Sequence, residues 1–166
     1  MPFLIITIAP VIIMLVVIVS RNFRLIYWFS LAMFIAAFLS LFLVIPHTPH
    51  GFEPLLMIDR FGVLFLGIIF LGSVLITMLS YDYLKVHGGE REEYFIILFV
   101  AVLGASVLAV SEHFISFFLG LETLSISLYI LIAYIKTRDY CIEAGVKFLV
   151  IASLATAFLL FGIGLI

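Results

Sequence analysis

The segment FISFFLGLETLSISLYILIAYI, residues 114–135, is apolar enough and long enough to cross a membrane as a helix. About 20 mostly apolar residues, each rising about 1.5 Å, span the hydrocarbon core of a bilayer. The only formal charge in the segment is Glu122, near its middle. Two questions follow: how many such helices the chain contains, and what a carboxylate does at the centre of one.

The composition of the whole chain is that of an integral membrane protein. Its 166 residues are 66% hydrophobic and 11% charged, whereas soluble domains are about 45–50% apolar and about 25% charged. The Lys and Arg residues are scattered along the chain and form no basic patch, so the sequence gives no indication of nucleic-acid binding. No Cys or His cluster has the spacing of a zinc, haem or iron–sulfur site.

Five further apolar runs predict an all-α, polytopic membrane bundle that fills residues 1–166 as a single domain. Polar or Pro- and Gly-containing breaks separate the runs. The first run has no basic residue before it, so we interpret it as a retained helix rather than a cleaved signal peptide. The six predicted membrane helices cover residues 2–20, 25–45, 60–81, 94–110, 114–135 and 141–166.

The distribution of basic residues predicts the orientation of the bundle. Lys and Arg favour the cytoplasmic side of a membrane. The first, third and fifth loops carry six of them, the second loop carries one, and the fourth carries none. We therefore expect the N-terminus outside and the following residues on the cytoplasmic side: Arg21, Arg24, Lys85, Arg91, Lys136 and Arg138.

Glu122 is the main candidate for a functional residue. An ionisable group at membrane depth costs at least about 2.5–3.5 kcal/mol on insertion scales and marks functional sites. Ser125 and Tyr129 share its helix face, and their hydroxyls can hydrogen-bond a carboxyl or hold water beside it. Burial favours a neutral carboxyl and a nearby cation favours a charged one, as a proton relay requires. A carboxyl that stays protonated and bonds a neighbouring helix fits the residues equally well.

A second set of charges lies near the start of the last predicted helix. Glu143 and Lys147 are four residues apart with Glu first, which is the favourable order for an ion pair on one helix face. They are a possible charge pair in a transfer pathway. Lys147 can also extend its long stem to the membrane surface, with Glu143 as its companion. We interpret the four histidines as solvated residues in loops or at helix ends: His47, His50, His87 and His113.

Three blocks of the sequence resemble one protein family. They are MIDRFGVLFLGIIFLGSVLITMLSYDYL (57–84), EEYFIILFVAVLGASVLAVSEHFISFFLGLETLSISLYILIAY (92–134) and EAGVKFLVIASLATAFLLFGIGLI (143–166). Together they are similar to the antiporter-like membrane subunit N of proton-translocating NADH:quinone oxidoreductase, respiratory complex I. The resemblance is more distant to subunits L and M and to cation/proton antiporter subunits. The motifs FFLGLE and EAGVKFLV carry it, and the DYL…EEY joint favours subunit N.

The resemblance implies a role for each of the charged residues. Glu122 matches the mid-membrane Glu of the family's buried proton-transfer axis, and Lys147 and Glu143 match a Lys and a Glu near the start of the next helix. It implies no redox cofactor in this chain: NAD, FMN, iron–sulfur clusters and quinone are expected in other subunits. It also implies a multi-pass location in the bacterial inner (plasma) membrane, with other complex I membrane subunits and lipid as partners.

Two departures from the family pattern qualify this expectation. Ser127 stands where many members have Pro, so a softer kink is expected in that helix. The family continues beyond residue 166 with a broken helix 7, whose buried Lys partners the Glu, and with an inverted five-helix repeat. We therefore expect the N-terminal portion of a subunit N that takes part in proton translocation coupled to quinone reduction. The alternatives are a cation/proton antiporter subunit and a structural, non-translocating membrane segment.

Overall fold

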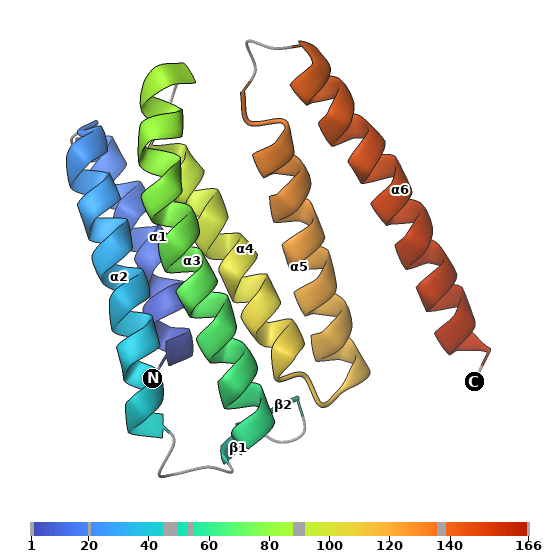
Figure 1. Cartoon of the computed structure of the whole chain (residues 1–166). Helices are drawn as coiled ribbons and strands as arrows, with labels where there is room; N and C mark the ends of the chain where they lie inside the picture. Colours follow the sequence, from blue (N-terminus) through green and yellow to red (C-terminus); the bar gives the residue numbers. More distant parts are fainter. Residues whose placement is uncertain are drawn as a thin grey trace.

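The computed structural model of the protein describes residues 2–19, 21–44, 50–52, 55–87, 92–135 and 139–165. Within these ranges the elements are α1 (Pro2–Val19), α2 (Phe23–Val44), β1 (His50–Phe52), β2 (Leu56–Ile58), α3 (Arg60–His87), α4 (Glu93–Ala109), α5 (Phe114–Ile132) and α6 (Asp139–Gly164). Helices α1 to α4 form one group, α5 packs beside α4, and α6 lies outermost, next to α5 (Figure 1). The predicted all-α bundle of six helices is confirmed.

Five of these helices, all except α4, are long and apolar enough to cross a membrane. The exception, α4, has 17 residues, which corresponds to about 25 Å of helix. It packs against α1, α3 and α5, and its buried residues include Phe95, Phe99 and Gly104. A helix enclosed by its neighbours does not need the full length of a lipid-facing one. The chain is therefore a multi-pass membrane protein whose fourth helix lies inside the bundle.

The prediction was wrong about the end of the third helix. It placed the end at residue 81 and a polar loop over residues 82–93, but α3 continues to His87. Hydropathy falls at Asp82, whereas the helix depends on backbone hydrogen bonds that also form in water. Leu84 is buried and keeps this last part of α3 against the bundle. The fifth helix is shorter than predicted, because α5 ends at Ile132 and the predicted helix ended at residue 135.

A small hairpin occupies part of the segment that was predicted as a Pro/Gly/His loop. Its antiparallel register pairs His50 with Ile58, Gly51 with Met57 and Phe52 with Leu56. The hairpin is attached to the turn between α4 and α5. The Met57 amide donates to the Val110 carbonyl at 2.9 Å, and the Glu112 amide donates to the Leu55 carbonyl at 3.2 Å. The Ser116 hydroxyl donates to the same Leu55 carbonyl at 2.6 Å. This contact closes one end of the bundle.

The core of the first four helices consists of close-packed apolar side chains. Phe34 of α2 and Phe99 of α4 are fully buried, and their rings stack with centroids 3.9 Å apart and planes 9° from parallel. In a bilayer, lipid solvates leucine as well as protein does, so helices associate through packing and polar contacts rather than through hydrophobic exclusion from water. Shape complementarity of this kind therefore holds α2 against α4.

A very close approach between helix backbones joins α4 to α5. A Cβ atom added to Gly104 would lie 2.6 Å from the Leu124 nitrogen, and one added to Gly120 would lie 2.8 Å from the Leu108 nitrogen. The two backbones are therefore in direct contact, and only glycine fits at both positions. Small residues that allow such contact are typical of membrane helix interfaces. This contact fixes the position of α5, the helix that carries Glu122.

The outermost helix, α6, packs on the bundle through a single stripe. At the end nearest its connection to α5, a Cβ on Gly145 would lie 2.7 Å from the Cβ of Ala133. Towards the C-terminus α6 diverges from α5 (Figure 1). Its other faces are exposed along its length, with Ile151 68% and Phe158 68% accessible. Such a surface suits lipid or another membrane helix.

The two ends of the bundle differ in charge. Arg21, Arg24 and Lys85 lie at the end where α1 meets α2 and α3 stops, whereas Arg60 lies at the hairpin end (Figure 1). Arg91, Lys136 and Arg138 fall outside the described residues. Among the described residues, three of these basic side chains thus lie at one end of the bundle and one lies at the other. That the end with three faces the cytoplasm stays a prediction.

Candidate functional site

Glu122 lies in the middle of α5, eight residues after Phe114 and ten before Ile132. These separations place it about 12 and 15 Å from the two ends of the helix. The residue is half-buried. Its Oε1 atom is buried and has no hydrogen-bond partner, and no other buried side-chain nitrogen or oxygen within the described ranges shares that property. A buried acceptor without a partner costs about 1–3 kcal/mol, and more when it is charged.

The hydroxyl groups near Glu122 do not satisfy this oxygen. Thr123 donates to the Leu119 carbonyl and Ser127 donates to the Thr123 carbonyl, each at 2.7 Å. These bonds follow the i to i−4 pattern by which Ser and Thr bond their own helix. Ser125 and Tyr129, which were expected to assist the carboxyl, do not bond Oε1 either. The Oε1 atom is therefore left without a hydrogen-bond donor among the described residues.

Glu122 faces away from α4 and towards α6. Two residues along an α-helix rotate by about 200°, so Glu122 lies nearly opposite Gly120, which contacts α4. Seven residues return to almost the same direction, so Tyr129 lies above Glu122, about 10 Å along the helix axis. The Tyr129 carbonyl lies 3.2 Å from the Cβ position of Gly145 in α6. Glu122 is thus on the stripe of α5 that faces α6.

An open groove of ≈ 330 Å³ begins on this stripe, between α4, α5 and α6. Its lining includes an acidic residue at the start of α4, two tyrosines of the α5 end and apolar residues of α6: Glu93, Tyr129, Tyr134, Val146 and Leu149. The groove lies at the end of the bundle that carries Arg21 and Arg24. Of its polar lining residues, Tyr129 lies about two helical turns from Glu122 along α5. Sequence reasoning did not single out Glu93, because it falls in the polar break just before the predicted helix 94–110.

The second candidate pair forms, but apart from Glu122. Lys147 Nζ and Glu143 Oε1 are 2.5 Å apart, and the two side chains are 70% and 63% exposed. Both residues lie about 200° around α6 from Gly145, the residue that contacts α5. They therefore point away from α5. The structure joins Glu143 to Lys147 and does not bring either of them to Glu122.

Other polar residues in this region have structural roles. The Nδ1 atom of His113 accepts a hydrogen bond from the Ile115 amide at 3.2 Å and caps the start of α5. His47, His50 and His87 have side chains outside the described set. Within the described ranges, no three His, Cys, Asp or Glu side chains lie together as metal ligands.

Comparison with known proteins relates the chain to one group of membrane proteins. Residues 111–166 match the family model described as NADH:quinone oxidoreductase/Mrp antiporter, transmembrane. The whole chain is 34% identical over 170 residues to NADH-quinone oxidoreductase subunit N of Methylococcus capsulatus. It is 33% identical over 168 residues to the protein of the same name from Acinetobacter baumannii, with 99% of the chain covered.

A solved structure supports the same relation. One chain of respiratory complex I from Thermus thermophilus, solved with bound aureothin, matches 98% of this chain with a TM-score of 0.83 and 26% identity. The match covers 35% of that chain, and the chain spans 34% of each of the two curated relatives. The resemblance inferred from the sequence blocks is confirmed, and it concerns about a third of the relatives' length.

Proposed function

We propose that this chain, similar along its length to part of NADH-quinone oxidoreductase subunit N, is the N-terminal portion of such a subunit. In that role it takes part in proton translocation coupled to quinone reduction. It works as one part of a larger enzyme complex in a bacterial inner membrane. NAD, FMN, iron–sulfur clusters and quinone belong to other subunits of the complex, which are its protein partners.

The observation that carries this proposal is the buried Oε1 atom of Glu122, which has no hydrogen-bond partner within the described residues. A buried acceptor at mid-helix, on a face that leads to an open groove, has the properties of a protonatable relay. Oε1 of Glu122 bonds no neighbouring helix within the described residues, which leaves this oxygen available to a new donor. The location of Tyr129 on the same stripe supports a path between the groove and Glu122.

Protons move through Glu122 because its charge state responds to its neighbours. A cation that approaches a buried carboxyl favours the ionised form, and withdrawal of the cation favours proton uptake. Lys147 is held by Glu143 on the far face of α6, so we assign the cation role to a Lys of a further helix, as the family resemblance implies. Lys147 and Glu143 act at the membrane surface.

The test replaces Glu122 in the complete membrane enzyme and measures proton pumping and NADH:quinone activity in inverted vesicles. Glu122→Gln keeps the size and polarity of the side chain but removes the titration, so pumping falls by a factor on the order of 100 if every proton passes through it. Glu122→Asp retains the carboxyl and largely retains pumping. Thr123→Val is the matched control, because the Thr123 hydroxyl bonds only its own helix within the described contacts. Normal pumping by the Gln variant in a fully assembled enzyme rules out the relay.

A cation/proton antiporter subunit is the second candidate, because the matched family model includes both classes. Vesicles that contain the wild-type protein distinguish the two. Sodium-driven proton movement that persists without NADH and quinone identifies the antiporter. Proton movement that requires electron transfer and is insensitive to Na⁺ identifies the oxidoreductase subunit.

A further inference from the structure

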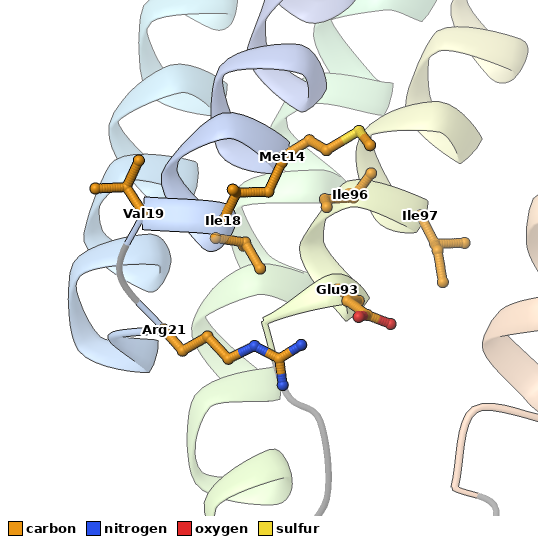
Figure 2. Close-up of a pocket in the computed structure, with 8 residues that line it drawn as sticks. Met14, Ile18, Val19, Arg21, Glu93, Ile96 and Ile97 are labelled. Atoms are coloured by element: carbon orange, nitrogen blue, oxygen red, sulfur yellow. The ribbon is translucent and has the colours of Figure 1, made fainter.

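A second groove lies between the end of α1 and the start of α4, and it shares Glu93 and Ile97 with the groove between α4, α5 and α6. Its volume is ≈ 680 Å³. The walls are mainly apolar, with Met14 and Ile18 from α1 and Ile96 and Ile97 from α4. Figure 2 shows Arg21 and Glu93 together at one end of this groove, with the apolar side chains extending away from them.

The sequence creates this groove by placing two apolar faces side by side. On α1, Met14, Val17 and Ile18 are spaced i, i+3, i+4 and share one face. On α4, Glu93, Ile96 and Ile97 have the same spacing. Both faces border the core, because Val17 and Ile96 pack partly against it, whereas Met14 and Ile18 are mainly exposed. The groove therefore opens towards the surroundings of the bundle, and Ile18 is 72% exposed.

The charges lie at helix ends, where the lipid headgroups of a bilayer are expected. Arg21 follows the last residue of α1 by two positions, and Glu93 is the first residue of α4. The apolar walls begin within one turn of each, so the groove runs from the membrane surface into the hydrocarbon layer. A phosphate is the natural partner of an arginine at this level. Glu93 in turn offers an acceptor to a cationic group beside that phosphate.

We propose that this groove binds a diacyl phospholipid with a primary ammonium headgroup, of the phosphatidylethanolamine type. The lipid phosphate binds Arg21, the ammonium donates hydrogen bonds to Glu93, and an acyl chain lies along Ile18 and Ile97. A phosphatidylglycerol headgroup brings no cation for Glu93. A phosphatidylcholine headgroup carries a quaternary ammonium, which has no N–H to donate. A transmembrane helix of another protein would have to cover both charged residues, which is costly in lipid surroundings.

The test maps the lipid directly in native membranes. A photoreactive amino acid replaces Ile18, and the irradiated protein is purified with the subunits that accompany it. Mass spectrometry then identifies the adducts. The same amino acid at Leu79 is the reference, because Leu79 is 76% exposed and lies in the half of α3 nearest the same end of the bundle. Adducts at position 18 are expected to be enriched in phosphatidylethanolamine relative to those at position 79.

Two variants test the headgroup contacts. Arg21→Gln and Glu93→Gln each lower the enrichment by roughly fivefold, the effect of one charge contact at a membrane surface. Arg24→Gln, at the same end of the bundle but outside the groove, leaves it unchanged. Three outcomes would overturn the proposal. They are equal lipid composition of the adducts at positions 18 and 79, enrichment of phosphatidylglycerol or phosphatidylcholine at position 18, and adducts with a polypeptide. None of these readouts requires proton pumping, so the result is independent of the role of Glu122.

Discussion

The contact between α4 and α5 predicts that Gly104→Ala destabilises the protein. The added Cβ would lie 2.6 Å from the Leu124 nitrogen and 3.1 Å from the Gly120 oxygen. Both are backbone atoms, which a side-chain rotation cannot move. Ordinary contact for such a Cβ begins at 3.4 Å, about 0.8 Å further than the Leu124 nitrogen. The two helices therefore have to separate along the contact that positions Glu122.

The magnitude follows from two opposing effects. Overpacking of a tight interface costs about 1–3 kcal/mol. Alanine has a higher helix propensity than glycine by up to about 1 kcal/mol, which partly offsets that cost. Gly72 provides the control because it lies inside α3 and a Cβ there has no atom within 4 Å. The free energy of unfolding of Gly104→Ala should therefore fall about 1–3 kcal/mol below that of Gly72→Ala.

The assay is reversible unfolding of the purified protein in mixed micelles, followed by circular dichroism. Gly120→Ala should destabilise similarly, since its Cβ would lie 2.8 Å from the Leu108 nitrogen. The double variant should lose less than the sum of the single losses, because helices already separated accommodate the second methyl group. If Gly104→Ala and Gly72→Ala have equal stability, α4 and α5 are not in backbone contact and the reasoning fails.

Two further predictions concern the hairpin and the surface ion pair. Ser116→Ala removes the hydrogen bond from the hydroxyl to the Leu55 carbonyl. The free energy of unfolding should fall by about 1 kcal/mol, and the Met57 and Glu112 amides should exchange faster with deuterium than in the reference variant Thr123→Ala. Unchanged exchange would show that this bond does not hold the hairpin. Lys147→Met removes the ion-pair partner of Glu143, and pumping persists because both residues point away from α5. A large loss of pumping would instead assign Lys147 to the transfer path.

The sequence alone determined the number of helices and their approximate positions. In lipid, each apolar segment of about 20 residues satisfies its own backbone hydrogen bonds by forming a helix. Hydropathy can therefore identify each helix without reference to the rest of the chain. The same reasoning failed at residues 82–87, because hydropathy reports where α3 leaves the apolar layer and not where its backbone bonds stop. The Glu143–Lys147 pair was also predictable, since residues four apart share a face of any α-helix.

Tertiary structure decided what these local features face. The hairpin depends on Val110 and Ser116, which lie more than fifty residues from its strands, so no local pattern indicates it. The sequence placed Glu122 at mid-helix, but the packing of α5 through Gly104 and Gly120 turns it away from α4, and its Oε1 has no partner among the described residues. Gly145 likewise turns Lys147 away from α5. Helix rotation results from the packing of all neighbours together, and this is why the sequence could name the charged residues but not which of them meet.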